Sequence, residues 1–163
     1  MLYKGCAFRF GDNINTDDII AGRYKHSTMD LDMLAKHAME NILPGFHSLV
    51  QPGDFIVAGE NFGCGSSREQ APQIIKHIRV SAVVAKSFAR LFFRNAINIG
   101  LLLIICNTDP IIEGDVLEYR HELQQLAVPE RELFISTPAM PRELWELIEA
   151  GGLLEYVKRK GGL

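Results

Sequence analysis

The sequence predicts an α/β fold, and three observations lead to that prediction. Short apolar runs at 55–58, 80–85 and 101–105 are typical of parallel strands that are buried on both faces. Segments with helical spacing separate these runs, and such alternation favours a largely parallel sheet with crossover helices. Beyond Cys106, short amphipathic segments indicate antiparallel strands and therefore a β-rich C-terminal part. At 163 residues with 47% hydrophobic content, the chain is expected to form one domain over residues 1–163.

The first third of the chain combines one strand with one helix. Residues 3–10 are predicted to form the first strand, and Gly11-Asp12-Asn13 provide a turn after it. A polar loop rich in aspartate follows. Apolar residues then recur at helical spacing from Leu31 to Met39, with Asp30 able to cap the start and Pro44-Gly45 ending the segment.

The later elements follow from the same signals. Helices are expected from the glycine-rich stretch near residue 66 to His77, and over residues 87–96. Strands are expected over 115–120, 123–128 and 131–136. Pro141 opens a further helix over 142–150 that Gly151-Gly152 close, and 153–160 is expected to be helical.

Charge and cysteine content narrow the classes of function. Seventeen basic and twenty acidic residues give a net charge of −3, and no basic block suggests a nucleic-acid partner. No apolar run approaches the roughly 18 to 20 residues of a membrane span, and the N-terminal stretch lacks the apolar core of a signal peptide. The three cysteines show no C-x-x-C spacing, so neither disulfides nor a zinc site is indicated. We therefore expect a soluble, unprocessed cytoplasmic protein.

The stretch GENFGCGSSREQAP at residues 59–72 is the strongest candidate for a functional site. Its glycines lie where a buried strand passes into a helix, and a helix N-terminus with close backbone access favours bound anions. The stretch does not fit the P-loop pattern because no lysine follows its glycines, and it lacks the third glycine of G-x-G-x-x-G. A phosphate- or nucleotide-binding module is therefore the weaker interpretation.

Two interpretations remain open for Ser66. Ser66 and Glu69 match the S-x-x-E capping box, in which both side chains satisfy free amides at a helix start. Pro72 fits poorly with a regular helix that begins at residue 67, since a proline beyond the first turn removes an amide. In the second interpretation, Ser66 and Arg68 take part in chemistry on an anionic substrate.

Three separated motifs resemble one known family. NFGCGSSREQAP at 61–72, FGDNINTDDII at 10–20 and AKSFARLFFRNAINIGLLL at 85–103 are similar to small subunits of the isopropylmalate dehydratases, in the aconitase superfamily. The motifs occur in the family's order and span roughly residues 8 to 105. The resemblance implies the swivelling β/β/α domain of that superfamily, here as a separate chain.

The resemblance also implies roles for individual residues. Ser66 is implied as the general base, acting as an alkoxide on the carbon beside a carboxylate, while Ser67 and Arg68 hold the substrate or stabilise the oxyanion. Asp17, in the T-D-x-I motif, is placed at the edge of the site. In the family, the loop after this motif contacts the variable part of the substrate; the corresponding residues here are Tyr24, Lys25, His26, Ser27 and Thr28.

The resemblance also implies a reaction, a cofactor and a partner chain. The reaction would be the isomerisation of 2- and 3-isopropylmalate by dehydration and rehydration, in leucine biosynthesis. Lys25 and His26 depart from a more apolar family pattern, so homoaconitate, citramalate and 2,3-dimethylmalate stay open as alternative substrates. It also stays open that both residues are solvated and make no contact with the substrate. The chain itself is expected to hold no cofactor, and a large subunit is implied to carry a [4Fe-4S] cluster.

The remaining predictions concern partners and other residues. We expect a hydroxy-dicarboxylate or hydroxy-tricarboxylate as substrate, neither nucleic acid nor membrane as a partner, and leave open a homo-oligomer of the small subunit alone. The histidines share no ligand spacing and are not expected to be catalytic. Arg90 and Arg94 are expected to serve structure or the interface with the partner.

Overall fold

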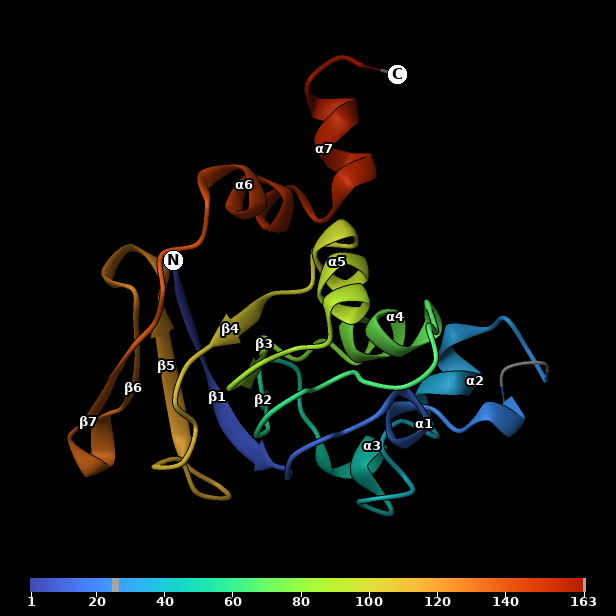
Figure 1. Cartoon of the computed structure of the whole chain (residues 1–163), viewed down its shortest axis with the longest axis horizontal. Coiled ribbons are helices and arrows are strands. Elements are labelled where there is room, and N and C mark those ends of the chain that lie inside the picture. The colour runs from blue at the N-terminus through green and yellow to red at the C-terminus, as the bar shows by residue number, and fades with distance from the viewer. Residues whose placement is uncertain (25–26, 163) are drawn as a thin grey trace.

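The computed structural model describes residues 1–24 and 27–162. Within these residues the strands form one seven-stranded sheet in the order β4-β3-β2-β1-β5-β6-β7 (Figure 1). The strands are β1 (Leu2–Arg9), β2 (Phe55–Val57), β3 (Ala82–Ala85), β4 (Leu103–Ile105), β5 (Val116–Arg120), β6 (Gln125–Val128) and β7 (Leu133–Ser136).

One half of the sheet is parallel, as the apolar runs predict. β1 pairs with β2, β2 with β3 and β3 with β4, all in parallel register. Helices α4 (Gln70–His77) and α5 (Arg90–Asn98) form the crossovers from β2 to β3 and from β3 to β4. The longer connection from β1 to β2 contains α1 (Thr16–Ile19), η1 (Gly22–Tyr24), α2 (Leu31–Ala35) and α3 (Phe46–Leu49).

The other half of the sheet is antiparallel, and it continues from the same central strand. β5 pairs with β1 from Leu2 opposite Arg120 to Cys6 opposite Val116. β6 and β7 then add in antiparallel register. Short 3-10 helices, η2 (His121–Leu123) and η3 (Pro129–Arg131), connect these strands. The predicted β-rich part is therefore an extension of one continuous sheet.

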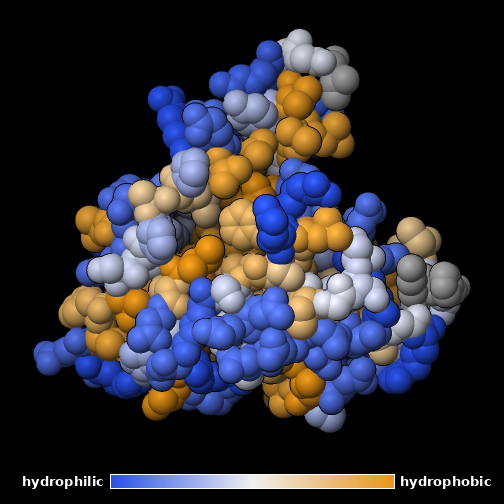
Figure 2. Space-filling model, viewed as in Figure 1, coloured by the Kyte–Doolittle hydropathy of each residue, from blue (hydrophilic) through white to orange (hydrophobic). Residues whose placement is uncertain are grey.

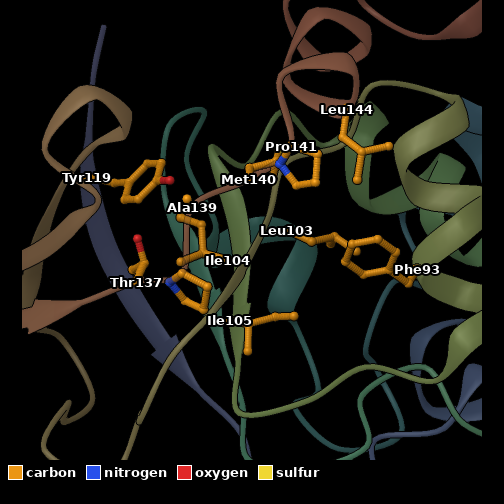
Figure 3. Close-up of a pocket in the computed structure, with 11 residues that line it drawn as sticks. Phe93, Leu103, Ile104, Ile105, Tyr119, Thr137, Ala139, Met140, Pro141 and Leu144 are labelled. Atoms are coloured by element: carbon orange, nitrogen blue, oxygen red, sulfur yellow. The ribbon is translucent and has the colours of Figure 1, made fainter.

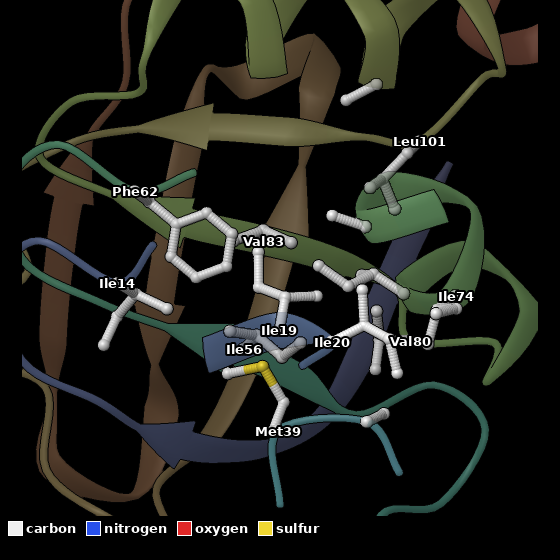
Figure 4. Close-up of a cluster of buried hydrophobic side chains, with 14 of the residues drawn as sticks. Ile14, Ile19, Ile20, Met39, Ile56, Phe62, Ile74, Val80, Val83 and Leu101 are labelled. Atoms are coloured by element: carbon white, nitrogen blue, oxygen red, sulfur yellow. The ribbon is translucent and has the colours of Figure 1, made fainter. Parts of the chain in front are cut away.

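The sheet has a hydrophobic core on each face, because its central strands are buried on both sides. Ile56 and Val83 belong to the core under α1, α2 and α4, of which Figure 4 shows labelled members. Phe55 and Val84 point to the opposite core, which α6 (Arg142–Ala150) covers with Trp145. α7 (Leu153–Arg159) follows and projects from the body of the domain in Figure 1.

Several predicted boundaries differ from the structure for identifiable reasons. The helix expected through Met39 ends at Ala35, and Met39 has a left-handed φ of 58° that an α-helix cannot contain. The helix expected from Ser87 starts at Arg90, because the Ser87 carbonyl accepts a hydrogen bond from the Phe62 amide (3.1 Å) in a bridge between two loops. The bounds expected for α6 agree with the structure.

Candidate active site

The loops that carry the predicted site residues meet at the carboxyl ends of β1, β2 and β3. The Gly63 amide donates to the Ile14 carbonyl (2.7 Å), and the Thr16 amide donates to the Cys64 carbonyl (2.9 Å). These bonds join the loop after β1 to the glycine-rich loop after β2. Ligands of open α/β sheets bind in this position, beyond the carboxyl ends of parallel strands.

The glycine-rich loop has a backbone that most residues cannot adopt. Gly63 and Gly65 have φ values of +83° and +90°, in the left-handed region. A Cβ at Gly63 would lie 2.2 Å from Cγ of Phe92, so this glycine also provides space for a core aromatic ring. The loop therefore needs glycine at residue 63 for both conformation and packing.

The capping-box interpretation of Ser66 and Glu69 is wrong. α4 begins at Gln70, with Glu69 as its N-cap in a right-handed helical conformation and without a side-chain cap bond. Pro72 consequently lies in the first turn, where the missing amide would have no helical partner. Ser66 and Ser67 lie before the helix and are exposed, which leaves their hydroxyl groups accessible to a ligand.

Arg68 and Asp17, predicted separately, lie in direct contact. Nη1 of Arg68 donates to the Asp17 carboxylate and to the Ile20 carbonyl (2.8 Å). The Arg68 side chain is 11% exposed, whereas that of Asp17 is 55% exposed. The hydrogen bond from Arg68 holds the pKa of Asp17 below its usual value, so the carboxylate stays charged beside the guanidinium.

The structure adds Gly22 to this pair. The Gly22 amide donates to the Asp17 carboxylate (3.1 Å). A Cβ at this position would lie 3.1 Å from Nη2 of Arg68. Gly22, the first residue of η1, thus lies against the guanidinium. Because η1 ends at Tyr24, this contact connects the predicted substrate loop to the serine-arginine stretch.

Two residues of the site, Asn15 and Thr16, were missed by the sequence reasoning. Asn15 caps α1: its side chain accepts from the amides of Asp17 and Asp18, and Asp18 completes a capping box. The hydroxyl of Thr16 donates to the backbone carbonyl of Ser66 (2.7 Å). An asparagine three residues before an aspartate is a helix-start signal, and it could have indicated α1 where the sequence analysis expects a polar loop.

The predicted substrate loop is described only in part. The ring of Tyr24 stacks on His37, with centroids 3.9 Å apart. Ser27 donates to the Tyr24 carbonyl (2.8 Å), and the Thr28 hydroxyl accepts from the Asp30 amide (3.0 Å). The predictions for Lys25 and His26 lie outside the described residues. Those described side chains of the loop therefore make local contacts, and their role toward a substrate stays a prediction.

Potential ligands for metals are dispersed. Across residues 1–24 and 27–162, no three side chains of His, Cys, Asp or Glu group around a common point. Cys6 is exposed, Cys64 is half-buried and Cys106 is buried, in different parts of the sheet and its loops. In the same described ranges, no helix has the length and apolar character needed to cross a bilayer.

A separate cavity of about 110 Å³ lies away from the serines, between β4, α5 and the segment that leads into α6 (Figure 3). Hydrophobic residues gather in the middle of the face shown in Figure 2. The lining of the cavity is mainly apolar and contains no charged group: Phe93, Leu103, Ile104, Ile105, Tyr119, Thr137, Pro138, Ala139, Met140, Pro141 and Leu144. This cavity therefore offers no cationic side chain to an anion, whereas Arg68 lies beside Ser66 and Ser67.

The fold and site together define a class of protein: an α/β domain with two exposed serines and an Asp17-bound arginine in the loops beyond its parallel strands. Residues 11–108 match the family model described as the aconitase C-terminal domain. The chain belongs to this family, and its fold is that family's swivelling α/β domain.

Similarity extends over the full length of several relatives. The 3-isopropylmalate dehydratase small subunit of Halothermothrix orenii is 50% identical, covering 100% of this chain and 98% of the relative. The methanogen homoaconitase small subunit of Methanocaldococcus jannaschii is 47% identical, over 98% and 94% respectively. A crystal structure of 3-isopropylmalate dehydratase (leuD) from Methanocaldococcus jannaschii superposes with a TM-score of 0.94 at 46% identity, covering 99% of this chain and 96% of that one.

Proposed function

We propose that the chain is the small subunit of a two-chain hydro-lyase that isomerises 2- and 3-isopropylmalate by dehydration and rehydration, a step of leucine biosynthesis. The observation that carries this proposal is the arrangement of exposed Ser66 and Ser67 beside the Asp17-bound Arg68. The full-length similarity to 3-isopropylmalate dehydratase small subunits supports the same reaction.

Ser66 acts as the general base in this proposal. The reaction removes a proton from the carbon beside a carboxylate, and negative charge develops on the carboxylate oxygens. A serine hydroxyl is a very poor base near neutral pH, so its alkoxide needs preorganised donors nearby. The N-terminus of α4, which starts four residues after Ser66, and the guanidinium of Arg68 supply positive potential at this end of the sheet.

Arg68 and Ser67 orient the substrate carboxylate. Nη1 of Arg68 carries the bonds to Asp17 and Ile20, which leaves Nε and Nη2 able to donate to a ligand. A planar guanidinium held on one side presents its remaining donors in a fixed direction, and this geometry matches a carboxylate. In this scheme Asp17 lies at the edge of the site, and Tyr24, Lys25, His26, Ser27 and Thr28 lie toward the variable part of the substrate.

The second half of the reaction requires a partner chain. Loss of hydroxide from the neighbouring carbon is assisted by a Lewis acid, which a [4Fe-4S] cluster supplies when bound. The dispersed cysteines of this chain do not fit such a cluster. We therefore assign the cluster to a large subunit and the active site to the junction of the two chains.

We assign the complex to the cytoplasm.

One relative supports homoaconitate as a second candidate substrate. The methanogen homoaconitase small subunit is nearly as similar to this chain as the isopropylmalate enzymes are. Overall identity therefore does not separate the two substrates. Relative kcat/KM of the reconstituted complex for 3-isopropylmalate and homoaconitate separates them, and a higher value for isopropylmalate is expected.

The central experiment is Ser66→Ala in the complex reconstituted with its large subunit. We expect kcat to fall by several orders of magnitude with KM nearly unchanged, because the proton acceptor is lost while the carboxylate donors remain. Thermal unfolding should be close to wild type, since the exposed Ser66 side chain does not cap α4. A folded, assembled and fully active Ser66→Ala complex would rule out the catalytic assignment.

A further inference from the structure

The Thr16 hydroxyl contacts the serine stretch, although the two are fifty positions apart in the sequence. The Thr16 residue is 3% exposed, and its Oγ1 donates to the backbone carbonyl of Ser66 at 2.7 Å. The amide of the same residue donates to the Cys64 carbonyl at 2.9 Å. Thr16 therefore holds the glycine-rich loop at two carbonyls, on either side of Gly65.

The neighbouring residue of α1 holds the arginine. Asp17 accepts a hydrogen bond from Nη1 of Arg68, and Arg68 also donates to the Ile20 carbonyl directly after α1. One short helix thus binds the loop at Ser66 and the guanidinium at Arg68. We propose that Thr16 is a positioning residue, which fixes Ser66 relative to Arg68 through the Ser66 backbone carbonyl.

α1 is suited to this role because it is held from several sides. The Asn15–Asp18 capping box fixes its start. Ile19 is fully buried in the core, and the Met39 amide donates to its carbonyl (2.9 Å). The side-chain amide of Asn41 donates to the Asp17 carbonyl (3.3 Å). A helix anchored in this way transmits little movement to the groups that it holds.

The loop at Ser66, in contrast, has few constraints of its own. Gly65 lies directly before it at φ +90°, and glycine restricts the backbone less than any other residue. The side chain of Ser66 is exposed, and no helical capping bond orients it. The hydrogen bond from Thr16 therefore limits where the serine hydroxyl can lie.

The chain provides a matched control for Thr16. Thr108 is 0% exposed, and its hydroxyl donates to the Ala58 carbonyl at 2.7 Å. Both threonines are thus buried and make the same kind of bond to a backbone carbonyl at the same distance. Thr108 differs in that its bond is made directly after β2, eight residues before Ser66, whereas Thr16 binds Ser66 itself. A general structural effect should be equal at the two positions.

The experiment compares Thr16→Val, Thr16→Ser and Thr108→Val in the complex reconstituted with the large subunit. This inference rests on the proposed function, so Ser66→Ala is measured beside them. We expect Thr16→Val to lower kcat about tenfold or more with KM within about twofold, since small misplacement of a catalytic group slows chemistry strongly. Thr16→Ser keeps the hydroxyl and should restore most of the activity.

Thermal stability, measured beside kcat, distinguishes a positioning role of Thr16 from a general role in folding. Each valine variant removes one buried hydrogen bond, and both should lower the Tm of the isolated chain by a few degrees. Thr108→Val should nevertheless keep the wild-type kcat. Equal kcat in Thr16→Val and Thr108→Val, or a folded Thr16→Ser that stays as slow as Thr16→Val, would overturn the inference. An active Ser66→Ala would instead overturn the proposed function, so the two failures are distinguishable.

Discussion

Replacing Gly63 by alanine should destabilise the domain more than the same change at Gly114. Both glycines have φ +83°, so the cost of placing an L-residue in the left-handed region is the same at each position, about 1–2 kcal/mol. Nothing lies within 4 Å of a Cβ built on Gly114. The loss in the free energy of unfolding for Gly114→Ala should therefore be about 1–2 kcal/mol.

Gly63→Ala adds a steric clash to this conformational cost, which lowers the free energy of unfolding further. The new Cβ would lie 2.2 Å from Cγ and 2.5 Å from Cβ of Phe92, which is 4% exposed. The ring of Phe92 packs edge-on against Phe62 (5.3 Å between centroids) and stacked on Phe88 (6.4 Å), so it cannot turn aside without displacing them. Overpacking of this kind adds about 1–3 kcal/mol, giving a total of about 2–5 kcal/mol.

Urea unfolding of the isolated chain measures the difference between the two variants. The midpoint should fall further for Gly63→Ala than for Gly114→Ala, with the same m-value in both. Equal losses would mean that the loop relaxes away from Phe92, which would contradict the packing argument. Because Gly63 lies three residues before Ser66, the reconstituted Gly63→Ala complex should also lose activity, whereas Gly114→Ala should not.

Two further predictions concern titratable groups. The hydrogen bond from Arg68 lowers the pKa of Asp17, so the stability from this pair should be complete above the unfolded value near 3.8 and lost progressively as pH falls from there through the lower folded value. An NMR titration that placed the Asp17 pKa above 3.8 would contradict the pairing. Burial raises the pKa of Cys106 to about 12, so iodoacetamide at pH 8 should label exposed Cys6 and leave Cys106 unmodified until urea unfolds the chain. Mass spectrometry of the labelled peptides checks this, and early labelling of Cys106 in the folded chain would contradict its burial.

Elements with local signals can be predicted from the residues alone. Parallel strands buried on both faces need apolar residues at every position, and the runs at β2, β3 and β4 were therefore visible without the structure. Pro141 and Gly151 delimit α6 because proline suits a helix start and glycine adopts the left-handed cap, at φ +92°. The serine-arginine stretch and Asp17 were identified from motifs, and the family that they resemble is confirmed.

The way in which distant segments meet follows from the packed fold. The capping signal at Ser66 and Glu69 was misleading, since the loop bonds to α1 instead and α4 starts at Gln70. Local pattern also missed α1, whose four residues are too few to show helical periodicity. Thr16 and Ser66 are fifty positions apart, and β1 and β5 pair across more than a hundred. Such contacts depend on where the packed sheet places each loop, and residue periodicity does not encode that placement.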